Sequence, residues 1–169
     1  MIGSDRFHKL NNLPKLPEKY FKEAFESEYT HIEDPVSYSA ECAQFKNTKF
    51  YQMLRSRFGW VDAAFLKNEP MTFYNWHIDK GRKCAINWPI QSSDSAFTFY
   101  RDSLERRPLH IMERVDYELY TPTLIDTTFR HCVLNNSMEE RIILSIAISD
   151  KFYYKDVKQF LQQLTITEY

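Results

Sequence analysis

Between residues 61 and 149 the chain divides into short segments that are rich in Val, Ile, Thr, Tyr and Phe and are separated by turn-forming residues. Segments of this length and composition are typical of β-strands in sandwiches and barrels. Eight of them can be recognised, near residues 61–66, 71–79, 83–90, 95–100, 108–113, 116–126, 129–134 and 141–148. Eight short antiparallel strands suit a jelly roll, in which two sheets roll together and protect their edges. The sequence therefore predicts a mainly β core.

The last of these segments alternates most clearly, because successive side chains of a strand point to opposite faces. One face carries four aliphatic side chains, from Ile142, Leu144, Ile146 and Ile148. The other face is mixed and carries Arg141, Ile143, Ser145 and Ala147. The aliphatic face needs a cover, which flanking helices can supply. A guanidinium on the opposite face indicates that this face lines a cavity.

Helical patterns flank the β-rich region. After a loose start, residues 1–60 are expected to be mostly helical, with one helix beginning at Pro17 and another spanning about 43–58, before Gly59. Apolar residues at helical spacing support them: Tyr20, Phe21, Ala24 and Phe25 in the first, and Phe50, Tyr51, Leu54 and Phe58 in the second. A third, amphipathic helix is expected where Val157, Phe160, Leu161 and Leu164 share one side of the segment KDVKQFLQQL.

The 169 residues contain no repeat, low-complexity tract or linker, and this length suits one domain with a proper core. We expect a single domain over residues 1–169, in which residues 1–60 give helical support, 61–149 form the β core and 150–169 form a C-terminal helix. The net charge is -1, with 22 basic and 23 acidic residues, so no nucleic-acid partner is expected.

Three cysteines, Cys42, Cys84 and Cys132, lie far apart in the sequence. Such a sparse, odd set argues against a disulfide framework and against a Cys-rich zinc site. No apolar run has the length of a signal peptide or approaches the roughly 20 residues of a membrane-spanning helix. We therefore expect a soluble, cytoplasmic protein with no membrane partner.

A histidine and an acid two residues apart lie in the segment FYNWHIDKG. In an extended strand one face would carry Phe73, Asn75, His77 and Asp79. Alone, such a pair is more often a surface feature, but His131 follows, and ten residues later Arg141. Two imidazoles and one carboxylate can hold iron(II) and leave other positions open, and an arginine offers a bidentate fork for a carboxylate. The four residues together therefore favour a metal site.

This pattern resembles the iron(II)/2-oxoglutarate-dependent oxygenase superfamily, in particular its small members of the prolyl-hydroxylase-like or phage type. The segment WHIDKGRKCAINWPI resembles the metal-binding strand, and PTLIDTTFRHCVLNNSMEERIILSI resembles the closing strands. The resemblance implies a double-stranded β-helix (a cupin-like jelly roll) in which His77, Asp79 and His131 bind Fe(II) as the catalytic centre. Arg141 would bind the C5 carboxylate of 2-oxoglutarate. With O2 as co-substrate, the implied reaction converts 2-oxoglutarate to succinate and CO2 and hydroxylates a substrate.

Departures from the family pattern concern the 2-oxoglutarate contacts. Many members have Ser or Thr two residues after the arginine, where this chain has Ile143. The second carboxylate contact is therefore open, with Ser145 and Tyr100 as candidates. Asn75, on the expected face of His77, and Asn87 are further candidates for contacts with 2-oxoglutarate or substrate, although either amide could instead satisfy backbone groups.

Other positions bear on the reaction and the substrate. Nucleobase-dealkylating members have a second arginine where this chain has Ala147, which makes nucleobase repair less favoured. The carboxylate of Asp79 favours hydroxylation over halogenation. The stretch 101–116 is expected to form a rim or lid loop, with His110 as a structural or rim residue.

Three functions remain open on the sequence alone. The leading one is a hydroxylase acting on a small metabolite, an amino acid or a peptidyl residue, as a monomer or weak dimer. The second is a cupin-like metalloenzyme that does not use 2-oxoglutarate, for which Arg141 would have no purpose. The third is a non-catalytic jelly roll that binds a small carboxylate or a carbohydrate, which the complete set of three ligands disfavours.

Overall fold

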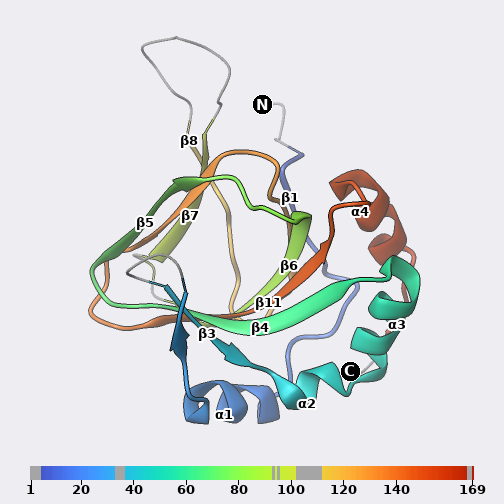
Figure 1. Ribbon diagram of the computed structural model, residues 1–169, viewed down its shortest axis with the longest axis horizontal. Helices are drawn as coiled ribbons and strands as arrows, with labels where there is room; N and C mark the ends of the chain where they lie inside the picture. The colour runs from blue at the N-terminus through green and yellow to red at the C-terminus, as the bar shows by residue number, and fades with distance from the viewer. Residues whose placement is uncertain (1–4, 33–36, 93, 95, 102–111, 167–168) are drawn as a thin grey trace.

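A computed structural model describes residues 5–32, 37–92, 94, 96–101, 112–166 and 169. Two antiparallel sheets face each other (Figure 1). The larger sheet has the order β1 (Phe7–Lys9), β9 (Thr123–Asp126), β6 (Arg82–Gln91), β11 (Arg141–Ser149), β4 (Val61–Asn68), β3 (Ser37–Glu41) and β2 (Thr30–His31). The smaller sheet has the order β5 (Thr72–His77), β10 (His131–Asn135), β7 (Ala96–Arg101) and β8 (Met112–Arg114). This is the expected mainly β jelly roll.

Each of the eight predicted segments contains a strand, in chain order β4 to β11. The segment near 108–113 is described only from residue 112 onward, so most of the expected rim loop, including His110, lies outside the described residues. The segment 116–126 is extended only at its end, as β9. Its first part is irregular: residues 119–120 form a turn in which Tyr120 has a φ of 66°, and Pro122 lacks a backbone donor for a sheet ladder.

Within the described residues, four helices flank the sheets: α1 (Lys19–Glu26), α2 (Ala43–Lys46), α3 (Lys49–Phe58) and α4 (Tyr154–Gln162). The helix predicted over 43–58 is in fact two helices, because the Thr48 hydroxyl accepts a hydrogen bond from the Tyr51 amide and so begins a new helix. Gly59 ends α3 with a φ of 73°. In the described part of the chain, no helix combines the length and apolarity that crossing a membrane requires.

The N-terminal region is less helical than predicted. It contains the three strands β1, β2 and β3, which sit at or near the edges of the larger sheet. β3 is held by five residue pairs with β4, from Ser37 opposite Asn68 to Glu41 opposite Ala64. These short strands owe their conformation to partners far along the chain, which local sequence patterns do not reveal.

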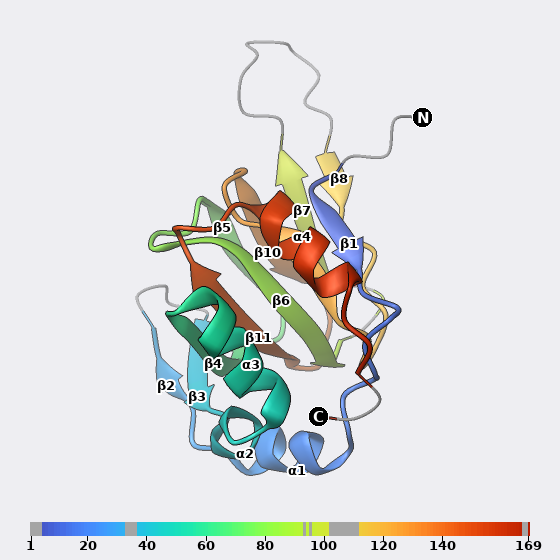
Figure 2. The same cartoon turned by 90° about the vertical axis from the view of Figure 1, so that its right-hand side faces the viewer.

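Strand β11 lies at the centre of the larger sheet, between β6 and β4. Its aliphatic face belongs to the main core, together with Leu54 of α3 and with Val157 and Leu161 of α4. Figure 2 shows α3 and α4 lying across this side of the sheet. The mixed face of β11 points the other way and lines a cavity between the sheets. Both predicted faces of this strand are therefore confirmed, and the cavity face brings Arg141 inside the molecule.

Candidate metal centre

The histidines and the acid singled out in the sequence converge at one end of the smaller sheet. His77 ends β5, His131 begins β10, and these two residues are paired across the strands. Asp79 follows in the loop that leaves β5. Its Oδ1 lies 3.4 Å from His77 Nε2 and its Oδ2 lies 3.9 Å from His131 Nε2. One donor atom from each of the three residues lies within 4.8 Å of the others, so the set can surround a single ion.

Both imidazoles are oriented by the backbone two residues before them. His77 Nδ1 lies 2.7 Å from the Asn75 carbonyl oxygen, and His131 Nδ1 lies 2.9 Å from the Phe129 carbonyl oxygen. A carbonyl oxygen only accepts hydrogen bonds, so each Nδ1 must carry the proton. This tautomer leaves the lone pair of each Nε2 free toward the centre, as in metal sites whose ligating histidines are held by outer contacts.

The surroundings of Asp79 and His131 favour the protonation states that a metal ligand needs. Burial raises the pKa of Asp79, but the contact with His77 and the charge of Arg82 outweigh it and hold that pKa well below its usual range. Burial lowers the pKa of His131 and favours its neutral form. A carboxylate and a neutral imidazole are therefore present at neutral pH without a metal to displace protons.

A bulge in β5 changes which side chains accompany His77. His77 is paired with His131, but Tyr74 is paired with Val133, so the two strands advance by unequal numbers of residues. Tyr74 consequently lines the cavity, and its ring stacks on that of His77 with centroids 4.1 Å apart. The predicted face was wrong for Asn75, which is exposed and accepts a hydrogen bond from the Trp76 amide. The same holds for Phe73, which is 48% exposed.

Arg141 lies in the same cavity as the three candidate ligands and is only 3% exposed. Its Nη1 donates to Asn68 Oδ1 at 3.2 Å and its Nη2 donates to Thr98 Oγ1 at 3.3 Å. Its guanidinium carbon lies 5.6 Å from the centroid of the Tyr117 ring. No acidic side chain of the described residues forms an ion pair with it.

Arg141 is therefore not a surface residue, and the neighbouring Glu140 pairs instead with Lys67 at 2.8 Å. Burial lowers the pKa of the Arg141 guanidinium, because no acidic side chain among the described residues compensates for the loss of water. A buried charge of this kind needs a partner, and a bound anion can supply it.

The remaining sequence candidates divide into two groups. Ser145 and Asn87 face each other across β11 and β6 and line the cavity, and Asn87 Nδ2 donates to the Tyr117 hydroxyl at 2.9 Å. Tyr100 is buried but does not line the cavity. Its hydroxyl donates to the Asp126 carbonyl at 2.8 Å, and its ring packs 5.9 Å from that of His131. The structure thus places Tyr100 behind a histidine and away from Arg141.

Asn68, Thr98 and Tyr117 surround Arg141 but were not predicted from the sequence. Asn68 is the residue paired with Arg141 across β4 and β11, and Thr98 projects from the opposite sheet. Only the alternation of the segment AFTFYR, which separates Thr98 from the two Phe residues beside it, offered a local signal. The cavity that all these residues share has a volume of about 340 Å³, within the range of small-molecule sites.

The two facing antiparallel sheets, with this centre at one end of the cavity between them, define a class of structure, the double-stranded β-helix or jelly roll. No family model and no curated protein sequence matches the chain. Among solved structures, it is similar to an oxidoreductase of the 2OG-Fe(II) oxygenase family from Burkholderia pseudomallei (TM-score 0.53, 11% identity, covering 75% of this chain and 73% of that one). The resemblance seen in the sequence is therefore confirmed in the fold.

Two further structures are similar over more of their length. A prolyl hydroxylase from Trichoplax adhaerens, in complex with a peptide fragment of the hypoxia inducible factor oxygen degradation domain, gives a TM-score of 0.60 at 11% identity, covering 89% of this chain and 86% of that one. AviO1 from Streptomyces viridochromogenes Tue57 gives a TM-score of 0.58 at 13% identity, covering 86% of this chain and 90% of that one. At such identities the likeness establishes the fold.

Proposed function

We propose that this protein is an Fe(II)- and 2-oxoglutarate-dependent oxygenase that hydroxylates its substrate. The observation that carries the proposal is the buried Arg141, which has no acidic partner among the described residues, in the same cavity as His77, Asp79 and His131. A metal site alone does not need such a cation. A ligand with a metal-chelating oxo acid at one end and a carboxylate at the other would satisfy both parts of the cavity.

The donor set fits iron(II). Two neutral imidazoles and one carboxylate form the 2-His-1-carboxylate arrangement, which leaves coordination positions open on one side of the metal. Bound iron(II) would supply, with O2, the oxidative decarboxylation of 2-oxoglutarate to succinate and CO2, coupled to hydroxylation of a substrate C–H bond.

The protein's own residues would bind and orient the oxo acid. Arg141 neutralises the distal carboxylate, while Asn68 and Thr98 hold the guanidinium in place. In place of the Ser or Thr that many family members have after the arginine, we propose that Thr98, Tyr117 and Ser145 complete the carboxylate site, because Thr98 and Tyr117 contact Arg141 and Ser145 lines the same cavity. The second carboxylate contact would then come from two strands, β7 and β11, and from the loop after β8, which are far apart in the sequence and meet only in the fold.

The substrate would reach the centre from the side of β3 and β4. On that side the cavity is lined by Ser39, Ala64 and Leu66. The cavity has a volume of about 340 Å³. With 2-oxoglutarate bound, the space left would suit a small metabolite, an amino acid or a side chain of a peptide.

An anaerobic titration tests the proposal. Purified protein receives iron(II) and then 2-oxoglutarate, and the visible metal-to-ligand charge-transfer band of the chelate is recorded. We expect the band in the wild type and its loss in His77→Ala and His131→Ala. Arg141→Ala should keep the metal but weaken 2-oxoglutarate by roughly 10- to 100-fold, since a hydrogen bond to a charged group contributes about 1.5–3 kcal/mol. The exposed neighbour of His131 provides a matched control, because Arg130→Ala should behave as the wild type.

The other outcomes favour the remaining functions. Iron binding without the band would support a cupin-like metalloenzyme that does not use 2-oxoglutarate. A wild-type protein that binds no iron would be a non-catalytic jelly roll, and its Arg141 would then hold a different anion.

A further inference from the structure

The two oxygens of the Asp79 carboxylate have different surroundings. Oδ1 lies nearest to His77, at 3.4 Å from Nε2. Oδ2 accepts a hydrogen bond from Arg82 Nε at 2.7 Å, within an ion pair whose side chains are only 10% and 24% exposed. Charge-assisted contacts of this length are among the stronger hydrogen bonds in proteins. The carboxylate therefore cannot rotate freely, and one of its oxygens is already engaged.

The local fold delivers Arg82 to this position. The chain crosses from the smaller to the larger sheet between Asp79 and Arg82, through a turn in which Gly81 has a φ of 77°. Arg82 begins β6, where it is paired with Ser149 of β11, and its carbonyl accepts a hydrogen bond from the Thr127 hydroxyl at 3.3 Å. The guanidinium thus projects from a strand held on both sides, and Arg82 also lines the cavity.

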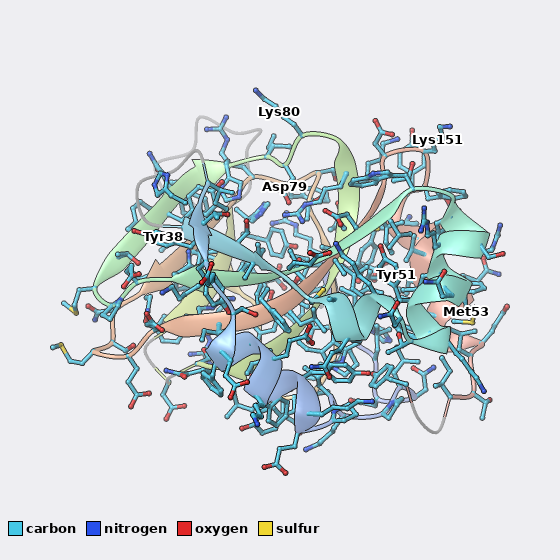
Figure 3. All side chains as sticks on the ribbon, turned by 60° about the horizontal axis from the view of Figure 1, so that its bottom comes forward. Tyr38, Tyr51, Met53, Asp79, Lys80 and Lys151 are labelled. Carbon is cyan, nitrogen blue, oxygen red and sulfur yellow. The ribbon has the colours of Figure 1, made fainter. Side chains whose placement is uncertain are left out.

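Figure 3 shows how the turn separates its charged side chains. Asp79 lies toward the interior of the barrel, whereas Lys80 extends outward into solvent. The turn therefore carries one cation directed at the metal centre and one directed away from it. Arg82 and Lys80 can therefore be compared as two positive charges that are close in sequence, of which Arg82 contacts Asp79.

A carboxylate can bind a metal through one oxygen or through both. Binding through both would take up a further coordination position on the metal. In the proposed function, an octahedral metal has six coordination positions. The oxo acid takes two of them and O2 takes one, so the protein can supply only three ligand atoms. A contact that restricts the Asp79 carboxylate to one ligating oxygen therefore preserves the metal positions that 2-oxoglutarate needs.

We propose that Arg82 is a positioning residue that engages Asp79 Oδ2, restricts the carboxylate to a single ligating oxygen and so keeps a metal position open for 2-oxoglutarate. This inference rests on the proposed function. Arg82 acts through Asp79 and needs no contact with the oxo acid. A purely structural ion pair would have a different effect, since its loss would weaken the fold and the metal site together.

The test compares Arg82→Gln, Arg82→Lys and, as a control of equal charge change on the same turn, Lys80→Gln. Two affinities are measured for each: that for Mn(II), by the electron paramagnetic resonance of the free ion, and that of the Fe(II) form for 2-oxoglutarate, by the charge-transfer band. We expect Arg82→Gln to keep its Mn(II) affinity within about threefold but to lose about tenfold or more in 2-oxoglutarate affinity. Arg82→Lys should recover most of this loss, because an ammonium can also donate to Oδ2. Lys80→Gln should match the wild type.

Every other pattern overturns the proposal. Unchanged 2-oxoglutarate affinity in Arg82→Gln, while the wild type gives the band, removes Arg82 from this role and leaves the proposed function intact. Equal losses of Mn(II) and 2-oxoglutarate affinity, together with a lower melting temperature, make the ion pair merely structural. A wild-type protein that binds Mn(II) and gives no band with Fe(II) and 2-oxoglutarate refutes the proposed function itself, and this role with it.

Discussion

In the proposed function, Arg141 would serve ligand binding at the expense of the stability of the fold. Its charge is buried, its described hydrogen-bond partners are the uncharged Asn68 and Thr98, and burial lowers its pKa. Moving a cation out of water costs several kcal/mol, which neutral hydrogen bonds recover only in part. The ligand-free protein therefore carries an electrostatic cost that a bound carboxylate would remove.

Arg141→Gln tests this cost. The amide keeps the capacity to donate to Asn68 or Thr98 but lacks the charge, so we expect the free energy of unfolding of the ligand-free protein to rise by about 1 kcal/mol. Urea denaturation of both proteins measures it. The exposed Arg130→Gln should remain within about 0.5 kcal/mol of the wild type. A loss of more than about 2 kcal/mol in Arg141→Gln would mean that the guanidinium holds the two sheets together.

The burial of His131 predicts how the free energy of unfolding depends on pH. Burial lowers its pKa in the folded state, so below the ordinary imidazole value of about 6.5 the unfolded chain binds more protons than the folded one. The free energy of unfolding of the metal-free protein should therefore fall as the pH is lowered from 7 to 5. The lowered pKa of Asp79 acts only in stronger acid, where that carboxylate takes up its proton.

Urea denaturation at pH 7 and pH 5 measures the effect, and His131→Asn should show a smaller difference between the two pH values. Burial also lowers the pKa of His8, so His8→Asn serves as the control that removes a separate contribution. If His131→Asn retained the full pH dependence of the wild type, the burial of His131 would not be its source.

At the scale of elements, the strands of the barrel core could be predicted because each combines strand-forming residues with flanking turns. β11 was the clearest case, since its aliphatic face and its Arg141 face demand opposite surroundings. The N-terminal strands could not be found this way. β3 becomes extended because β4 offers it a sheet edge, and the break between α2 and α3 depends on a single hydroxyl, that of Thr48.

The candidate site was likewise predictable in part. That His77, Asp79, His131 and Arg141 share one cavity could be predicted, because a candidate metal site with a carboxylate-binding arginine is specific in residue type and order. The residues that line the cavity around these four could not be predicted. A bulge replaces Asn75 with Tyr74 beside His77, and it exists only through the register of β5 against β10. Thr98 meets Arg141 from the opposite sheet, which is a property of the closed barrel.

Two glycines provide a matched pair of element-scale variants. Gly81 and Gly59 have φ values of 77° and 73°, and no neighbouring atom would lie within 4 Å of a Cβ added at either position. Alanine at either position should thus cost about 1–2 kcal/mol of folding free energy, from backbone strain alone. Only Gly81 lies in the turn between Asp79 and Arg82, so only Gly81→Ala should also lower the Mn(II) affinity. Equal Mn(II) affinities in the two variants would show that the turn does not set the position of Asp79.

On the scale of the whole molecule, the site joins the two sheets. His77 and His131 belong to β5 and β10 of the smaller sheet, whereas Arg141 belongs to β11 of the larger one. A molecule of 2-oxoglutarate that chelates the metal and reaches Arg141 would link the sheets across the cavity. Its two ends would then reinforce each other, because the metal fixes the oxo acid where its distal carboxylate meets the guanidinium.

Thermal unfolding measures this coupling. At about 100 times its Kd, a ligand that binds only the folded state adds about 2.7 kcal/mol, which corresponds to roughly 5–10 °C for a chain of this size. We expect Mn(II) alone to give such a shift, 2-oxoglutarate alone to give little, and the two together to exceed the sum of their separate shifts. Succinate, which has the distal carboxylate but no oxo group, should add little to the Mn(II) shift, and Arg141→Gln should keep the Mn(II) shift while losing the increment from 2-oxoglutarate. An increment from 2-oxoglutarate that is equal with and without Mn(II) would contradict the linkage, because the carboxylate at Arg141 would then bind independently of the metal.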